Sequence, residues 1–235
     1  VGRATVIVNE ALQSKTIIFH PKLLPSIVIL DPKVTVSLPT HLTAATGMHA
    51  LSHSLEAFCS PLYHPMAEGI ALEGIRLVKE FLFQAVTDGG DLEARTQMLV
   101  ASTMGATAFQ KGLGAMHALS HPIGADLDTH HGLTNAVVMP YVLVFNREVI
   151  TDRITVLART LGLSPGFESF LGWILELRQS LGIPPCLDAL GFEERHAALL
   201  APRAAVDPTA ATNPRALSPR ILETLYRKAL SGDLD

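Results

Sequence analysis

The chain has 235 residues, of which 48% are hydrophobic and 17% are charged, and its formal net charge is −4. This composition provides ample material for a core and argues against a disordered chain. No run of lysine or arginine indicates a nucleic-acid surface, and no apolar stretch reaches the roughly 18 residues that a membrane-spanning helix needs. Cys59 and Cys186 belong to no paired cysteine motif, so we expect reduced thiols in a cytoplasmic protein.

The start of the chain differs from the rest. Three β-branched runs predict short strands at residues 4–8, 15–19 and 26–30. Three strands alone make a poor core, so we expect them to need a partner sheet. Because the first predicted strand begins almost at Val1, and Val1 is not a methionine, we interpret the start as an interior cut.

From about Pro39 onward, apolar residues recur at helical spacing. Asp91 and Thr129 are the predicted N-caps of two of these helices. The predicted helices cover residues 42–58, 65–86, 92–110, 116–125, 130–145, 153–161, 167–181, 192–200 and 219–230. The sequence therefore predicts a mainly helical domain with a small β segment at its front.

Five of the ten histidines have spacings that suit one metal and catalytic site. His49 and His53 are four residues apart, as are His117 and His121, so each pair lies on one face of its predicted helix. His131 follows at the start of a third helix. Neutral imidazoles are common ligands for zinc and divalent iron, and facing helices can hold such a cluster in the core of a bundle.

Either pair taken alone is as easily explained by histidines that are satisfied within the core. The two pairs together with the nearby His131 favour a metal site over ordinary core histidines. The other histidines without a comparable partner are interpreted as ordinary surface or loop residues: His20, His41, His64 and His196. Neither pair has a glutamate after its first histidine, so the metalloprotease pattern is absent.

The longer stretches around these histidines resemble the iron-containing alcohol dehydrogenase family. Residues 46–58, TGMHALSHSLEAF, resemble its signature helix, and residues 112–124, GLGAMHALSHPIG, resemble its second signature. The sequence HHGLTNA at 130–136 continues the pattern at the family's spacing, as does the segment 207–214 near the end.

The resemblance implies an all-helical metal domain of the dehydroquinate synthase-like fold, behind an α/β nucleotide-binding domain. Residues 1–31 would be the last strands of the nucleotide-binding domain, and residues 32–235 the helical metal and substrate domain. The implied reaction is reversible hydride transfer between an alcohol or aldehyde and NAD or NADP. The partners expected are this small-molecule substrate and further copies of the same chain, with no nucleic acid and no membrane.

The resemblance also assigns roles to single residues. It implies a divalent metal, Fe²⁺ or Zn²⁺, at His49, His53, His117 and His131. His121 matches a histidine near the nicotinamide that has a proposed role in proton transfer, and Phe109 falls near an aromatic residue at the nicotinamide. Gly112 and Gly114 either let the backbone approach substrate or cofactor closely, or simply break a helix.

Two departures from the family pattern qualify these expectations. At the position of His49 the family usually has aspartate, so four neutral imidazoles would favour zinc over iron. No glycine-rich phosphate-binding loop is found in the chain. We therefore expect little dehydrogenase activity from these 235 residues alone.

Three alternatives remain open at this point. The first is a reductase that works without metal, like the related maleylacetate reductases. The second is a helical remnant without catalysis, which acts by oligomerisation or not at all. The third is a metal-dependent hydrolase, which the sequence disfavours because no glutamate or aspartate lies directly beside a predicted ligand, although Asp126 and Asp128 are near His131.

Overall fold

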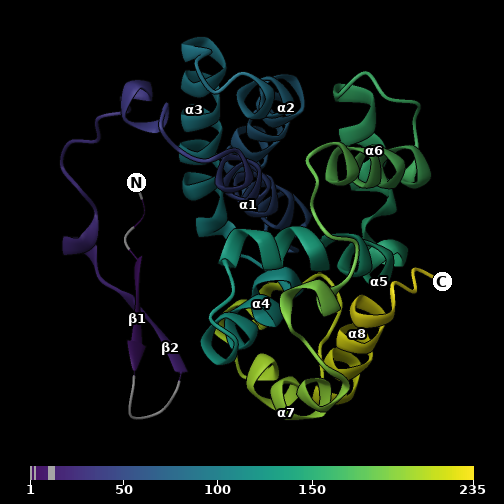
Figure 1. Cartoon of the computed structure of the whole chain (residues 1–235). Helices are drawn as coiled ribbons and strands as arrows, with labels where there is room; N and C mark the ends of the chain where they lie inside the picture. The colour runs from purple at the N-terminus through teal and green to yellow at the C-terminus, as the bar shows by residue number, and fades with distance from the viewer. Residues whose placement is uncertain (1, 3, 10–13) are drawn as a thin grey trace.

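The computed structural model describes residues 2, 4–9 and 14–235, and it opens with a β-hairpin. Strand β1 (Ala4–Asn9) runs antiparallel to β2 (Ser14–Phe19). The pair lies to one side of the helical body, where β2 approaches helix α4 (Figure 1). Two of the three predicted strands are therefore confirmed.

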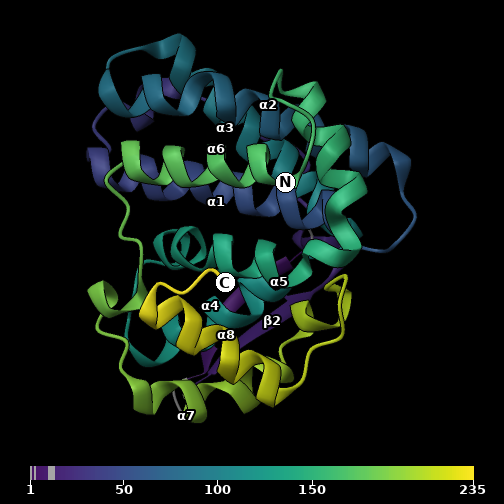
Figure 2. The same cartoon turned by 90° about the vertical axis from the view of Figure 1, so that its right-hand side faces the viewer.

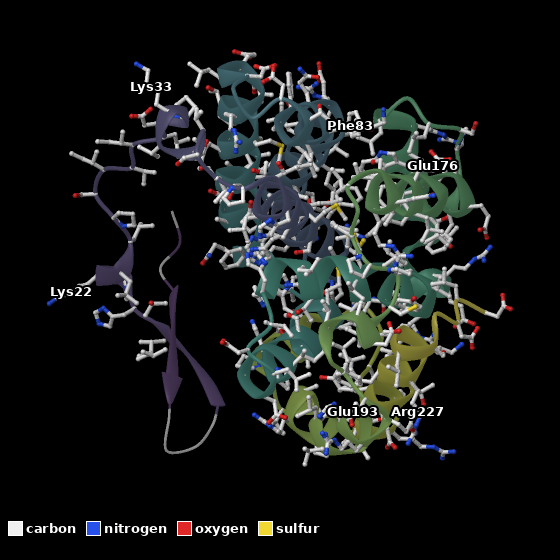
Figure 3. All side chains as sticks on the ribbon, in the orientation of Figure 1. Lys22, Lys33, Phe83, Glu176, Glu193 and Arg227 are labelled. Atoms are coloured by element: carbon white, nitrogen blue, oxygen red, sulfur yellow. The ribbon has the colours of Figure 1, made fainter. Side chains whose placement is uncertain are left out.

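The third predicted strand, at residues 26–30, is wrong. This segment has no regular structure, and its Ile27 and Ile29 are 77% and 84% exposed. A strand is held by hydrogen bonds to a neighbouring strand, and within the described residues the sheet contains only β1 and β2. Figure 3 shows the part of the connection around Lys22 standing away from the helices, whereas Pro32–Thr35, which includes Lys33, contacts the helix at Leu92–Ala108.

Eight α-helices and five short 3-10 turns follow within the described part of the chain. The helices are α1 (Thr40–Cys59), α2 (Pro65–Thr87), α3 (Leu92–Ala108), α4 (Ala115–Asp126), α5 (His131–Thr160), α6 (Phe167–Ser180), α7 (Glu194–Ala205) and α8 (Pro219–Ser231). The 3-10 turns are η1 (Pro21–Leu23), η2 (Pro32–Thr35), η3 (Phe109–Lys111), η4 (Leu187–Leu190) and η5 (Pro208–Thr212). The predicted mainly helical fold is confirmed.

The helices form two groups that share one core. Helices α1, α2 and α3 pack on one another, while α7 packs on α8 at the opposite end (Figure 2). Between them, α5 contacts α1, α4 and α6. Most of the apolar side chains of α2 are buried, including Ile75 and Leu82, although Met66 at the start of the helix is 76% exposed.

Helix α5 differs from its prediction in two ways. It is one helix of 30 residues, where the sequence indicated two separate segments, and it continues through Pro140. Burial of Ile150 and Ile154 against the core carries the helix across the polar stretch between the predicted segments. Its N-cap is His130, whose Nδ1 accepts from the Leu133 amide, and not Thr129 as predicted. The Asp91 cap of α3 is confirmed by its bond to the Ala94 amide.

A buried cation fixes the end of α1. The ammonium of Lys111 donates to the carbonyl of Ser60 at 2.8 Å and pairs with Glu68 of α2 at 2.9 Å. Cations near the C-terminus of a helix stabilise its free carbonyl groups. This contact holds α1, α2 and the turn before α4 together, so it supports the elements that carry the histidines.

Among the described residues, no helix combines the length and hydropathy required to cross a bilayer.

Candidate metal and catalytic site

The fold brings the five predicted histidines together from three helices. His49 and His53 lie one turn apart on α1, and His117 and His121 are one turn apart on α4. His131 is the first residue of α5. In each pair, the spacing of four residues places both imidazoles on the same face of the helix, as predicted.

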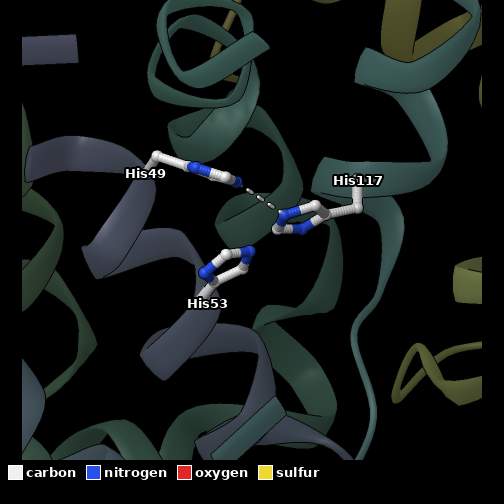
Figure 4. A group of neighbouring side chains, drawn as sticks. All are labelled: His49, His53 and His117. Carbon is white, nitrogen blue, oxygen red and sulfur yellow. Dashed lines mark hydrogen bonds between the residues drawn. The ribbon is translucent and has the colours of Figure 1, made fainter. Parts of the chain in front are cut away.

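Three of these imidazoles form the tightest group. The Nε2 atoms of His49 and His117 are 3.3 Å apart, and His53 stacks on His117 with ring centroids at 5.0 Å (Figure 4). One ring nitrogen from each of the three lies within 4.8 Å of the others. Nitrogens about 2.0–2.1 Å from a tetrahedral zinc ion lie about 3.3 Å from one another. The His49–His117 pair has this spacing, so the three histidines are a candidate site for a divalent transition metal.

His131 lies beside this group, with its ring centroid 4.7 Å from that of His49. Its Nδ1 is 3.4 Å from the Ser120 hydroxyl, and its Nε2 is 3.1 Å from the side-chain amide of Asn135. The structure thus places His131 in ring contact with the predicted ligands, while both of its nitrogens have polar neighbours outside the tight group.

The fifth histidine, His121, is held by a carboxylate. Its Nδ1 is 2.8 Å from Asp207 Oδ2, and its ring stacks on that of His131 at 5.2 Å. Asp207 is held in turn by the amide and the hydroxyl of Thr209. Burial raises the pKa of Asp207, but the hydrogen bond and charge interaction with His121, together with the Thr209 bonds, outweigh it and leave the pKa below its usual value. An ionised Asp207 therefore faces the ring of His121.

A second carboxylate lies behind His117. Glu56 of α1 is buried, and its Oε2 is 2.6 Å from His117 Nδ1. We expected no carboxylate directly beside a predicted ligand. This is correct for neighbours along the sequence, but it is wrong for the folded structure, where Glu56 contacts His117. Burial raises the pKa of Glu56 to about 8, against hydrogen bonds from the backbone at the start of α4. Glu56 lies within residues 46–58, which resemble the signature helix, and its position three residues after His53 places it on the same side of that helix.

The imidazoles of the tight group are neutral at physiological pH. Burial, together with the neighbouring His121 and His130, lowers the pKa of His49 to about 4. Burial and the surrounding imidazoles likewise hold the pKa values of His53 and His117 well below the ordinary value. Neutral imidazole is the form that binds a metal, so these residues are available as ligands at pH 7.

Phe109 borders the group on the side of α3. It begins η3, and its ring centroid is 4.9 Å from that of His53. The side chain is partly buried against the core. The residue predicted to face the nicotinamide therefore lies next to a predicted metal ligand, and its neighbours are aromatic.

The glycines near the site are explained by contacts within the protein. A Cβ on Gly132 would lie 2.5 Å from the Ala45 carbonyl oxygen, so this glycine allows α5 to approach α1 beside His49. Gly112 has a φ of +144° and faces Thr212. A Cβ on Gly114 would lie 3.0 Å from Glu56 Oε1. The atoms that Gly112 and Gly114 approach thus belong to the chain itself.

Three of the histidines expected to be ordinary serve as helix caps. The Nδ1 atoms of His20 and His64 accept from backbone amides at the starts of η1 and α2. His196 accepts from the Glu193 amide in a capping box and is only 5% exposed, so its assignment to the surface is wrong. His41 is exposed at the start of α1.

Comparison with known proteins identifies the family. Residues 43–230 match the Fe-containing alcohol dehydrogenase family, C-terminal region, and the chain belongs to this family. It is 40% identical over 228 residues to a 4-hydroxybutyrate dehydrogenase of Cupriavidus necator, covering 93% of this chain and 59% of that protein.

Solved structures agree with this assignment. A 1,3-propanediol oxidoreductase superposes with a TM-score of 0.94 at 34% identity, covering 98% of this chain and 62% of the other. The sulfoacetaldehyde reductase of Bifidobacterium kashiwanohense, in complex with NAD+, gives a TM-score of 0.90 at 29% identity, covering 99% and 62%. The chain therefore spans about three fifths of the length of these relatives.

Proposed function

We propose that this chain supplies the metal and substrate half of an enzyme that transfers a hydride between an alcohol or aldehyde and NAD or NADP. The observation that carries the proposal is the convergence of five histidines from α1, α4 and α5, three of them with ring nitrogens within 4.8 Å of one another. The family and the named relatives support it, since one is a 4-hydroxybutyrate dehydrogenase and another was solved with NAD+.

The proposed metal ligands are His49, His53 and His117, with His131 as the fourth. A divalent metal bound by these residues would polarise a substrate oxygen and lower the pKa of a bound alcohol. The chain's own contribution is to hold neutral imidazoles in a buried setting, as the lowered pKa of His49 indicates. Because residue 49 is histidine, the ligand set is neutral, which favours zinc over iron.

His121 is proposed as the residue that moves the alcohol proton. Asp207 accepts from Nδ1 of His121, which leaves Nε2 able to take a proton. The carboxylate also stabilises the imidazolium that forms. Phe109 is proposed to form part of the surface on which the nicotinamide packs, next to His53.

In keeping with its expected partners, we propose that the protein forms homo-oligomers, which light scattering would detect.

The test is an assay of alcohol oxidation with both nicotinamides, followed by absorbance, on the intact protein that contains this chain. Short-chain diols and 4-hydroxybutyrate are the first substrates to try, given the relatives. We expect a rate that requires metal and that falls on His121→Ala substitution. A metal-loaded protein with no rate on any alcohol or aldehyde would contradict the proposal and favour a helical domain without catalysis.

Metal analysis separates this proposal from a metal-free reductase of the maleylacetate reductase type. After anaerobic reconstitution, we expect about one equivalent of metal per chain. Less than about a tenth of an equivalent, with His49→Asp fully loaded, would refute the site built on four histidines. Activity without any bound metal would instead support the metal-free reductase.

A further inference from the structure

Glu56 is a buried acid that the proposed reaction does not use directly. Its side chain is 5% exposed, and that of its partner His117 is 2% exposed. Ionisable side chains are seldom buried to this extent unless they are paired or have a specific role. Glu56 lies three residues after His53 on α1, so it shares the helix face that carries the proposed ligands.

One oxygen of Glu56 caps helix α4. The amide of Met116 donates to Oε1 at 2.6 Å. The N-cap position of α4 is Gly114, which has no side chain to accept a hydrogen bond. Glu56 therefore satisfies a free amide at the start of α4 from a different helix, where the helix dipole also favours a negative charge. A cap of this kind needs only one acceptor atom.

The other oxygen faces a proposed metal ligand. Glu56 Oε2 lies 2.6 Å from His117 Nδ1. When Glu56 is ionised, its Oε2 can only accept, so Nδ1 of His117 carries the proton and Nε2 keeps its lone pair. That Nε2 is the atom 3.3 Å from His49 Nε2, inside the tight group of nitrogens. The contact thus selects the tautomer of His117 that can bind a metal.

We infer that Glu56 is a positioning residue for the metal site, which fixes the tautomer and ring orientation of His117. It also places a carboxylate one hydrogen bond away from a ligand set that lacks one at residue 49. Carboxylates bonded to a ligating histidine raise its basicity and commonly change metal affinity 10–100-fold when removed. The inference rests on the proposed metal site, with which it shares His117.

Substitution of Glu56 by glutamine separates the two roles. In Glu56→Gln, the amide oxygen can still accept from Met116, so the cap of α4 is kept. The amide nitrogen then faces His117 Nδ1 and donates to it, which favours the tautomer with the proton on Nε2. The change therefore leaves the local fold in place and blocks the nitrogen that faces the metal. Glu80→Gln, an exposed carboxylate on α2, is the matched control.

Two measurements test the inference. The ¹⁵N shifts of the His117 ring in the metal-free protein, recorded above the pKa of about 8 that burial gives Glu56, report which nitrogen carries the proton. Zinc affinity is measured by competition with a chromogenic chelator. We expect a protonated Nδ1 in the wild type and in Glu80→Gln, and a protonated Nε2 in Glu56→Gln. Zinc affinity should fall about 10–100-fold in Glu56→Gln alone, with a melting temperature close to that of the wild type.

Each outcome decides a different point. A wild-type His117 protonated on Nε2 would overturn the inference, and this readout needs no variant that must fold. Zinc affinity in Glu56→Gln equal to that of the wild type would also overturn it, while leaving the metal site intact. A wild type that binds no zinc would refute the metal site itself, and the inference with it.

Discussion

The close approach of α5 to α1 predicts the effect of adding one methyl group at residue 132. In Gly132→Ala, the new Cβ would lie 2.5 Å from the Ala45 carbonyl oxygen and 3.0 Å from His49 Cβ. Neither neighbour is the end of a flexible side chain, so one of the two helices must shift. Overpacking of this kind costs about 2–3 kcal/mol. Better helix propensity returns about 1 kcal/mol.

The net loss is therefore about 1–2 kcal/mol, which lowers the melting temperature of a chain of this size by about 2–8 °C. The matched control is Gly172→Ala on α6, where a Cβ would meet nothing within 4 Å. There only the gain in helix propensity applies, so the melting temperature should rise by up to about 4 °C. Calorimetry of the metal-free proteins measures both. A Gly132→Ala protein that melts at or above the wild type would refute the close contact.

Three further predictions concern the site. His49→Asp adds a hard, charged ligand, so the share of iron over zinc should rise after anaerobic reconstitution with both metals; an unchanged ratio would count against His49 as a ligand. Asp207→Asn removes the acceptor of His121, and the rate of alcohol oxidation should fall about 10²–10⁴-fold and depend differently on pH; an unaltered pH profile would remove Asp207 from the mechanism. Burial holds the pKa of His49 at about 4, below its usual 6.5, and those of His53 and His117 also lie lower. The unfolded chain thus binds more protons below about pH 6.5, so the metal-free protein should lose stability as the pH falls from there towards 4; chemical denaturation at several pH values would show it.

Most of the helices could be predicted because their apolar residues repeat with a regular period. The period fails where tertiary contacts decide the structure. The polar stretch near residue 150 interrupts the pattern, yet α5 runs through it because Ile150 and Ile154 are buried. The run at 26–30 has strong β propensity, but propensity cannot form a strand without a partner.

The sequence predicted that the five histidines lie together, but it did not predict their carboxylate partners. Pairs four residues apart are visible in a sequence because both members belong to one helix. The carboxylates that hold them are separated from their partners by 61 residues for Glu56 and 86 for Asp207. Only the packing of α1 and η5 against α4 reveals these contacts. The imidazoles could therefore be predicted from the sequence, whereas their hydrogen-bonded carboxylates are identified only in the folded structure.

The distribution of the imidazoles over separate helices has a consequence for the stability of the fold. His49 and His117 are 68 residues apart in the chain and approach only in the folded state. The proposed cation, held between them, would bind the native protein and not the unfolded one. It would then stabilise the fold by mass action, by about 2.7 kcal/mol when free metal is 100 times the dissociation constant. In a cell starved of such a metal, the protein would be exposed to unfolding and proteolysis, so its abundance would fall.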